Sequence, residues 1–523
     1  MQKGKMNVEE AGNASAIRPN IFQRVLAVAA CKAVRKFLRL RGSGGTALPG
    51  KAAMLFCRNI LEVTSSGMEI VVVTGTNGKT TTSRMLEHAI AEEGTCLANR
   101  SGANLLSGIT AEFTCSADWL GKPRKQYAVV ECDEAALKQV VPLLHPKVIV
   151  VTNLFRDQLD RYGEVMHTLE EIRRGIEKAP ESILCLNADC SLTASLADSR
   201  EIPGTDCADC GRGSTVFHAG PASASRTSSP TIHPVSSPAV PPASCRTDPA
   251  QKRIFWFGLN TPLGEQKDVP LSDAKYCIRC GTAYQYRYHT YAHLGSFYCP
   301  ACGYQRPEPD TAVLEILEMT ASDSRVRIMA GGREFETAVS LPAVYNLYNA
   351  MAAVCAGLAF GLDAERMCSS LADVHSGFGR METFRLGETQ GQMILVKNPA
   401  GCDQALSFIT NLPEERDLYF GLNDRTADGH DISWIWDVDF EKTIHRPCIR
   451  NIYVFGDRAE DLRLRLKYAD VPAEKITYLP DSPSLLKKLH ESRLPVWILP
   501  NYTAMLSLRE ELGKEDGMKA FWE

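Results

Sequence analysis

The sequence lacks any long apolar run, which argues against a helix that crosses a membrane. Such a helix needs about 18 to 20 consecutive apolar residues, and the 523-residue chain has no run of that kind. It also lacks an excess of one charge, because 58 Lys and Arg face 62 Asp and Glu. Without a global basic field, the composition gives no reason to expect a nucleic acid partner.

Features of a secreted protein are missing as well. The 18 cysteines are scattered, often in apolar runs, as is typical of free thiols in a reducing cytoplasm. The apolar segment 25–31 precedes its basic residues, whereas a signal peptide carries its charge first. Residues 21–40 instead predict a basic amphipathic helix, which packs on the next domain or rests on the inner face of a membrane. We expect a cytoplasmic protein of roughly two to four domains.

The stretch 69–82, EIVVVTGTNGKTTT, carries the clearest chemistry. Its apolar run, 70–73, predicts a buried parallel strand, and residues 83–90 predict a helix. Glycines between the two let backbone N–H groups face an anion, and the helix N-terminus adds a partial positive charge. A tight turn that binds nothing is the alternative, although packing hardly explains Lys-Thr-Thr at a helix start. The residues predicted to bind ATP here are Gly75, Thr76, Asn77, Gly78, Lys79, Thr80 and Thr81.

Acidic residues follow a second predicted strand. Runs 127–130, 148–152 and 182–186 indicate strands that alternate with helices, the pattern of a doubly wound α/β core. Glu131 lies directly after the first of these runs, followed closely by Asp133. A carboxylate in this position commonly completes a Mg²⁺ site, so Thr80 and Glu131 are the predicted magnesium ligands. Lys79 and Glu131 are also predicted to be catalytic, with an exposed acidic turn as the alternative for Glu131.

Four cysteines have the spacing of a structural metal site. Eighteen residues separate the pair Cys277 and Cys280 from the pair Cys299 and Cys302. Four thiolates with this spacing make a closed tetrahedral zinc site, which has no open position for water. We expect a zinc ribbon over residues 270–308, with a small β-ribbon between the pairs. Residues 201–252, rich in Ser, Pro and Ala, predict a low-complexity insertion before it.

The motif TGTNGKTTT resembles the ATP loop of the Mur ligases and folylpolyglutamate synthases, which join an amine to a carboxylate through an acyl phosphate. The segments NLYNA and GRME resemble further motifs of this family. The resemblance implies that Asn346, Asn349 and Arg380 approach the nucleotide, although helix capping is an almost equal alternative for Asn346. Gln158 stands where the family has a metal-binding histidine, which weakens the case for a second metal.

A second, Rossmann-like α/β unit is predicted by the apolar runs 393–396, 418–422, 451–455 and 496–499. The loop after the second run contains DGHDISW and five aspartates. This loop, the zinc ribbon and a late NYT resemble the MurT branch of the Mur ligase family. The resemblance implies the ligase subunit of a lipid II isoglutaminyl synthase. Such a subunit uses ATP, and ammonia from a GatD-like glutaminase, to amidate the D-glutamate α-carboxyl of the lipid II stem peptide. Asp431 would complete the catalytic triad of that partner.

Two other functions stay open at this point. An amino-acid-adding Mur ligase or a folylpolyglutamate synthase would act without a partner. A zinc-ribbon ATPase that binds nucleic acid would carry many basic residues on its ribbon, but only Arg279 and Arg287 lie between Cys277 and Cys302. The predicted layout is a disordered tail 1–20, a basic helical segment 21–65, a Mur-ligase-like central ATPase domain 66–384, and a C-terminal domain 385–523 that contacts the glutaminase.

Overall fold

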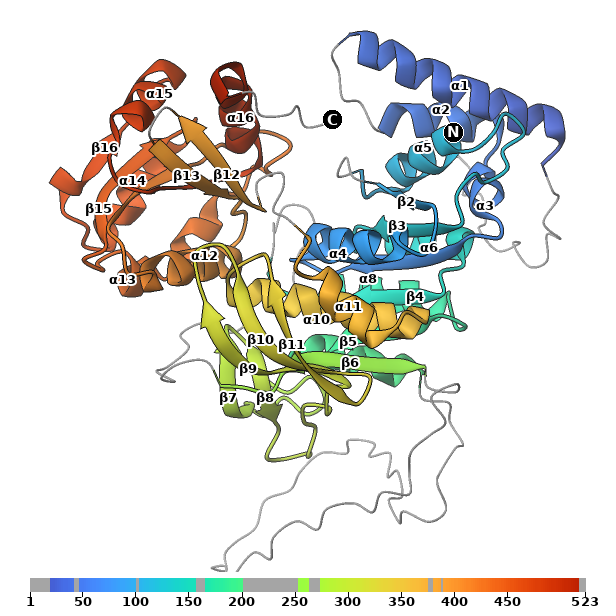
Figure 1. Cartoon of the computed structure of the whole chain (residues 1–523), viewed down its shortest axis with the longest axis horizontal. Coiled ribbons are helices and arrows are strands. Elements are labelled where there is room, and N and C mark those ends of the chain that lie inside the picture. Colours follow the sequence, from blue (N-terminus) through green and yellow to red (C-terminus); the bar gives the residue numbers. More distant parts are fainter. Residues whose placement is uncertain are drawn as a thin grey trace, which may run out of the picture.

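The computed structural model describes residues 19–41, 47–99, 103–156, 165–200, 253–262, 273–374, 380–386 and 389–516. The predicted insertion 201–252, Gln158 and the predicted tail up to residue 18 lie outside the described residues. The described chain folds around two sheets with helices on their faces, as Figure 1 shows.

The first sheet has nine strands in the order β11-β10-β9-β6-β5-β4-β1-β3-β2. Neighbouring strands are parallel from β2 to β9, and β10 and β11 extend the sheet as antiparallel strands. The predicted strands 70–73, 127–130, 148–152 and 182–186 are confirmed as β1, β3, β4 and β5. The bounds are β1 Glu69–Thr74, β2 Cys96–Ala98, β3 Tyr127–Glu131, β4 Val148–Val151, β5 Ile183–Asn187, β6 Ile254–Leu259, β9 Thr311–Met319, β10 Ser324–Ala330 and β11 Arg333–Val339.

Burial explains why the central strands read as continuous apolar runs. In β1 every residue after Glu69 is buried, because helices cover both faces of a parallel sheet. Helix α10 is buried on nearly its whole circumference and packs against α4 and the strands β4 to β6. The helices around this sheet are α4 Lys79–Ala91, α5 Leu106–Ser116, α6 Leu137–Leu144, α8 Val165–Glu177, α9 Ser191–Ala194, η1 Ser195–Arg200, α10 Val344–Phe360 and α11 Ala364–Ser370.

Three N-terminal helices lie at the edge of this unit, with α1 outermost (Figure 1). They are α1 Ile21–Leu40, α2 Ala47–Phe56 and α3 Ile60–Ser65, so the helix predicted for 21–40 is confirmed. Asn20 and Gln23 form a capping box that fixes where α1 begins. The inward side of α1 buries Ala27, Val28 and Cys31 in a small apolar cluster with residues of α2, α3 and α5.

The second sheet confirms the predicted C-terminal α/β unit. Its order is β12-β13-β17-β14-β15-β16, and only the pair β12–β13 is antiparallel. The strands are β12 Arg380–Leu386, β13 Thr389–Ile394, β14 Arg416–Gly421, β15 Ile449–Phe455, β16 Ile476–Tyr478 and β17 Val496–Pro500. The helices are α12 Pro399–Asn411, η3 Ser433–Asp437, α13 Phe440–Thr443, α14 Ala459–Tyr468, η4 Ala473–Lys475, α15 Ser482–Glu491 and α16 Tyr502–Asp516.

A two-stranded hairpin lies between the cysteine pairs, where the sequence predicts a small β-ribbon. Its strands, β7 Gln285–Tyr291 and β8 Leu294–Tyr298, pair antiparallel. The first residues of β8, Leu294 and Gly295, are buried, and Gly295 N donates to the backbone O of Asp189, just after β5. The hairpin is thereby fixed to the carboxyl edge of the large sheet.

Candidate active site

The loop between β1 and α4 requires glycine at two positions. Gly75 and Gly78 have φ angles of +118° and +86°, a region that favours glycine. A Cβ atom on Gly75 would lie 2.4 Å from Thr152 Oγ1, and one on Gly78 would lie 2.0 Å from Asn349 Oδ1. Both positions therefore require glycine, because of the turn and because Thr152 and Asn349 lie too close for a side chain.

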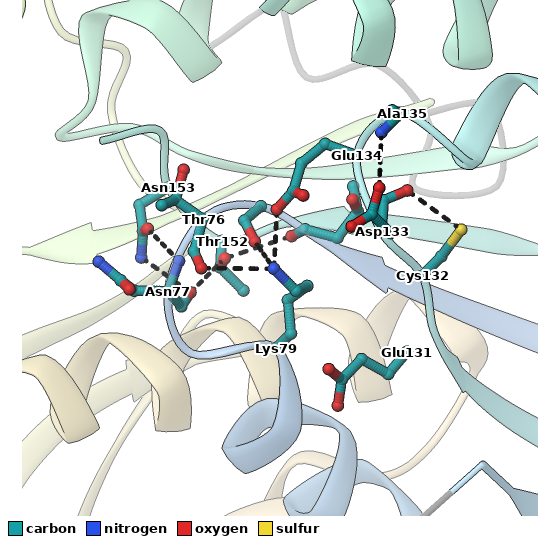
Figure 2. Close-up of polar contacts among 12 residues, drawn as sticks. Thr76, Asn77, Lys79, Glu131, Cys132, Asp133, Glu134, Ala135, Thr152 and Asn153 are labelled. Atoms are coloured by element: carbon teal, nitrogen blue, oxygen red, sulfur yellow. Dashed lines mark hydrogen bonds and ion pairs between the residues drawn. The ribbon is translucent and has the colours of Figure 1, made fainter. Parts of the chain in front are cut away.

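The loop is held by the residues that follow β4. Asn153 accepts from the backbone N–H of Thr76 at 2.9 Å and from that of Asn77 at 3.0 Å. Thr152 Oγ1 donates to Asn77 O at 2.7 Å, and Figure 2 shows these residues gathered on one side of the loop. The N–H groups of Thr76 and Asn77 thus fix the loop. The N–H groups at the start of α4 lack partners within the helix and are the ones placed to bind an anion.

Lys79 is nearly buried and has an anionic partner. Its Nζ lies 2.7 Å from Glu134 Oε1 and 2.5 Å from Gly75 O (Figure 2). Burial alone would lower the pKa of Lys79, but the carboxylates of Glu134 and Glu131 outweigh it and raise that pKa. The ammonium group therefore stays charged at the mouth of the loop, as phosphate binding requires.

Glu134 is a residue that the sequence-based prediction missed. It belongs to the run Glu-Cys-Asp-Glu, residues 131–134, which begins with the last residue of β3, and its side chain is buried. Asp133, which the pattern did single out, accepts from Ala135 N at 3.1 Å and caps the following turn. The available signal was a third acidic residue after the strand, but sequence alone does not say which of the three turns toward Lys79.

The two predicted magnesium ligands lie together. Thr80 Oγ1 donates to Glu131 Oε2 at 2.8 Å, which joins the start of α4 to the end of β3. Asn99 holds the backbone of Glu131 through two hydrogen bonds, of 2.8 and 2.9 Å. A hydroxyl and a carboxylate are oxygen donors of the kind that Mg²⁺ binds with a nucleotide, so these residues fit the metal.

A pocket opens beside the loop, between α10 and the second unit. It combines apolar and aromatic walls with side-chain amides, which suits a flat heterocycle with polar edges. Tyr291 enters it from the hairpin, so the cysteine-bearing segment contributes to the wall. The lining residues include Asn77, Gly78, Thr81, Tyr291, Tyr345, Asn346, Asn349, Met381, Ile394 and Gln404.

Asn346 and Asn349 are predicted to approach the nucleotide, and both line this pocket. Asn349 Nδ2 donates to Asn346 Oδ1 at 3.1 Å, and Asn346 Nδ2 donates to Pro342 O at 2.7 Å. The alternative that Asn346 caps its helix is wrong, because the N-cap of α10 is Ala343 and has no side-chain bond. The helix begins earlier than expected, and this moves both amides onto its inner face.

The second unit reaches the loop through Asn398. Its Nδ2 donates to Asn77 Oδ1 at 3.1 Å, while its Oδ1 accepts from Gly401 N at 2.9 Å and caps α12. Arg380 begins β12, next to the pocket residue Met381, but its side chain lies outside the described residues. Its predicted approach to the nucleotide stays a prediction.

The four predicted zinc ligands form one cluster. Their ligand atoms all lie within 4.8 Å of one another, with Cys277 Sγ 3.6 Å from Cys302 Sγ and Cys280 Sγ 3.4 Å from Cys299 Sγ. A tetrahedral zinc with bonds of about 2.3 Å has sulfur atoms about 3.8 Å apart, so the cluster fits that metal. Both pairs sit on tight turns closed by Gly281 N to Cys277 O and Gly303 N to Cys299 O.

The aspartate loop follows β14, where the strand order of the second sheet changes direction. Three of its five aspartates form ion pairs in the described chain and Asp428 is buried, whereas Asp431 forms no ion pair there. Its Oδ1 accepts from Ser433 N at 2.8 Å, and the side chain is partly exposed. Asp424 pairs with Arg458, Asp428 is buried and accepts from Thr503, Asp437 pairs with Arg156, and Asp439 pairs with Lys442.

Known proteins resemble this chain along most of its length. Family models described as "Mur ligase middle domain" and "MurT ligase C-terminal" match residues 73–233 and 395–505. The lipid II isoglutaminyl synthase (glutamine-hydrolyzing) subunit MurT of Streptococcus pneumoniae is 33% identical, over 91% of this chain and 94% of its own. The subunit MurT of Staphylococcus aureus is 29% identical, over 93% and 97%.

A solved structure resembles the fold. The pseudomurein peptide ligase type C from Methanothermus fervidus superposes with a TM-score of 0.59 at 17% identity. The superposition covers 87% of this chain and 80% of that one. Both the large nine-stranded unit and the C-terminal unit therefore have the architecture of a Mur ligase.

Proposed function

The chain belongs to the MurT family, and from this we propose that it is the ligase subunit of a lipid II isoglutaminyl synthase. In this proposal it amidates the α-carboxyl of D-glutamate in a lipid-linked peptidoglycan precursor and uses ammonia as the nitrogen donor. The observation that supports the chemistry is the nearly buried Lys79, 11% exposed, beside the Thr80–Glu131 hydrogen bond. The three groups stand where a nucleotide with its magnesium would bind.

The reaction needs an activated carboxylate. A carboxylate is a poor electrophile, but its acyl phosphate has a good leaving group, which ammonia displaces to leave an amide and phosphate. ATP supplies the phosphoryl group, and Mg²⁺ neutralises charge on it when both are bound. Lys79 would hold the phosphates as a fixed positive charge, and Thr80 with Glu131 would hold the metal.

The pocket beside the loop would receive the base of the nucleotide. Tyr291 and Tyr345 contribute aromatic side chains to its lining, and Asn346 and Asn349 contribute amide groups. Asn398 joins the second unit to the loop at Asn77, so closure of the two units would affect nucleotide binding. Arg380 is proposed to reach the nucleotide from the start of β12.

We assign zinc to the four-cysteine cluster, in a structural role. All four ligand positions would be occupied by thiolates, which leaves none for water or substrate. The hairpin next to it has a small apolar core, formed by Tyr284, Phe297 and Tyr304 together with two of the cysteines and Ala194 of α9. The metal would keep this hairpin in shape, and the hairpin places Tyr291 in the pocket wall.

A glutaminase is the proposed partner, bound at the C-terminal unit, which would make a heterodimer at the cytoplasmic side of a membrane. Asp431 would orient the histidine of the partner's cysteine–histidine pair. The geometry favours Asp431 over the other loop aspartates, because it is partly exposed and has no cation beside it in the described chain.

The alternatives differ in what they require. An amino-acid-adding ligase would work alone and would accept an amino acid in place of ammonia. A nucleic-acid-binding ATPase would need a basic ribbon, but the ribbon's Arg279 pairs with Asp198 and stacks on Tyr304. The family relationship favours amidation over both.

One experiment tests the proposal. The purified chain, with and without a candidate glutaminase, is incubated with ATP and a stem peptide whose D-glutamate has a free α-carboxyl group. Mass spectrometry then follows the conversion of carboxyl to amide with ammonium, glutamine or an amino acid as nitrogen donor. Amidation with ammonium by the chain alone, and with glutamine only in the complex, is the expected result. Addition of an amino acid, or no change with ammonium, would contradict the proposal.

A further inference from the structure

The outward face of α1 is apolar although it faces solvent. Phe22, Phe37 and Leu40 are 69%, 52% and 79% exposed. At 100° per residue these three side chains fall on one side of the helix, together with Ala33. The opposite side is the buried one, against α2 and α5. Packing within the chain therefore explains one face of α1 but not the other.

Basic side chains border this apolar stripe. Lys32, Lys36 and Arg39 lie along its edge and line a groove between α1 and α5. Arg35, the fourth cation of the groove, is paired with Glu112 at 2.8 Å. No carboxylate within the described residues forms an ion pair with the other three.

The charge of the whole segment is one-sided. Residues 21–61 contain eight Lys and Arg and no Asp or Glu, in a chain whose net charge is −4. The basic residues are Arg24, Lys32, Arg35, Lys36, Arg39, Arg41, Lys51 and Arg58. A surface of this kind is complementary to an anionic partner and repels a second copy of itself.

A tryptophan extends the surface from a neighbouring loop. Trp119 and Leu120, after α5, are 57% and 47% exposed. Lys32 joins them to α1, because its Nζ donates to Ala117 O at 2.8 Å and lies 4.8 Å from the centre of the Trp119 ring. Most of the exposed large hydrophobic side chains of the described residues lie between Ile21 and Leu120.

We propose that the outward face of α1, with Trp119 and Leu120, docks on the surface of an anionic lipid bilayer. The helix would lie in the plane of the headgroups, with Phe22, Phe37 and Leu40 toward the acyl chains. Tryptophan is enriched at this depth, and lysines beside it contact lipid phosphates. Within the described part of the chain no helix is long and apolar enough to span a bilayer, so surface contact is the geometry available.

The inference deepens the proposed function, since it states where the membrane of a lipid-linked substrate would lie. The binding itself does not depend on that function. Each basic residue near such a surface contributes about fivefold to binding, so several of them together with the apolar stripe give a stable but reversible contact.

The test measures binding of the full chain, with its glutaminase, to lipid vesicles by flotation. Vesicles of about equal parts phosphatidylglycerol and phosphatidylcholine should bind it, and vesicles of phosphatidylcholine alone should bind it much more weakly. Raising the salt concentration should weaken the first kind of binding. Equal binding to both kinds, or no binding to either, would overturn the proposal.

Two variants identify the surface. Lys32→Gln/Lys36→Gln/Arg39→Gln should weaken binding to the anionic vesicles about a hundredfold, and Phe37→Ser/Leu40→Ser should weaken it at least tenfold. The matched control, Leu464→Ser/Tyr468→Ser, removes exposed apolar side chains of α14 and should bind as the unaltered chain does. Loss of binding in the control, or its persistence in both α1 variants, would place the contact elsewhere.

Measurements of amidation distinguish a failure of this inference from a failure of the proposed function. On a water-soluble stem peptide, the α1 variants should amidate at the unaltered rate, because none of their substitutions is in the phosphate loop or among the residues that line the pocket beside it. Dimers of the chain that disappear in Phe37→Ser/Leu40→Ser, seen by light scattering, would identify the surface as a self-interface and overturn the proposal. Vesicle binding that does not depend on lipid charge, but that inorganic pyrophosphate releases, would instead identify a site for soluble phosphate.

Discussion

Arg306 Nε donates to Asp189 Oδ1 at 2.6 Å, in an ion pair whose two side chains are 6% and 0% exposed. Asp189 also accepts from Tyr348 OH at 2.5 Å and from Leu259 N at 3.0 Å. Burial alone would lower the pKa of Arg306, but the charge of Asp189 raises it. Since Arg306 follows the last cysteine and Tyr348 precedes Asn349, this ion pair connects the cysteine hairpin with the candidate nucleotide pocket.

Breaking this ion pair should be costly. Arg306→Leu would leave Asp189 as a buried carboxylate without its cation, which typically destabilises a protein by about 3–5 kcal/mol. Thermal unfolding should therefore occur at a clearly lower temperature. The double variant Arg306→Leu/Asp189→Asn removes both charges and should recover part of the loss. The exposed pair Arg253–Glu181 is the control, because Arg253→Ala should change stability by less than about 1 kcal/mol. An Arg306→Leu variant as stable as this control would show that the ion pair does not stabilise the fold.

Lys79→Ala should abolish ATP turnover. The variant loses the fixed positive charge at the phosphates, and removal of one such group costs at least about a hundredfold in rate. It also leaves Glu134 buried without its cation, so circular dichroism must show that the variant is folded. Lys147→Ala, which removes an exposed lysine paired with Glu69, should keep normal turnover. Full ATPase activity in folded Lys79→Ala would refute the phosphate-loop assignment.

One zinc ion should be found for each chain, held by Cys277, Cys280, Cys299 and Cys302. Replacing any one of them by Ser should lower both the zinc content and the unfolding temperature, because metal binding contributes directly to folding. Ammonia-driven amidation by the remaining folded protein should change little. Cys96→Ser, outside the cluster, should keep its zinc. Metal that is lost on deletion of residues 205–250, but retained in the Cys277→Ser variant, would show that other cysteines bind it.

Local motifs predict much of this structure because they report backbone requirements directly. The glycines at 75 and 78, the apolar run of β1 and the helix that follows appear in the sequence in the order that the fold uses. The cysteine spacing likewise predicts the cluster, since each knuckle is a local turn. Periodicity was sufficient for α1, whose bounds the structure reproduces.

The sequence does not reveal which residues, distant along the chain, contact each other in the fold. Three acidic side chains lie at the end of β3 or just after it, and only the tertiary packing makes Glu134 the partner of Lys79 and Glu131 the partner of Thr80. Asn398 meets Asn77 from another sheet, 321 positions along the chain. The alternative that Asn346 caps its helix failed for a local reason, because the helix is preceded by Ala343, a weak capping residue.

Stability should fall with rising pH because of Asp403. Burial raises the pKa of its carboxyl from 3.8 to about 7, and nearby Asp439 adds to the effect. Between these values the folded chain binds a proton that the unfolded chain has lost, so stability decreases as pH rises through this range and is lowest above about 7. Asp403→Asn keeps an acceptor for Asp439 N and removes the penalty. The variant should be more stable than the unaltered chain by roughly 1–3 kcal/mol at pH 8 but not at pH 4. An equal difference at both pH values would contradict this cause.

Asp431→Asn should separate the two nitrogen donors. The amide can still accept from Ser433 N, as Asp431 Oδ1 does at 2.8 Å, so the local turn should survive. It has no negative charge with which to stabilise the partner's histidine. Glutamine-driven amidation by the complex should therefore fall by at least about a hundredfold, while ammonia-driven amidation and ATP use stay near normal. Both rates are read from the amidation of the same stem peptide.

The matched control for this experiment is Asp481→Asn. Asp481 Oδ1 accepts from Ser484 N at 2.8 Å at the start of α15, so it too holds a nearby backbone N–H group, as Asp431 Oδ1 holds that of Ser433. If Asp431 acts only as a cap, the two variants should behave alike and keep both activities. If Asp431 serves the ligase site, its variant should lose ammonia- and glutamine-driven amidation together. Only a selective loss of the glutamine-driven reaction, with the complex still assembled by size-exclusion chromatography, fits a carboxylate that acts across the interface.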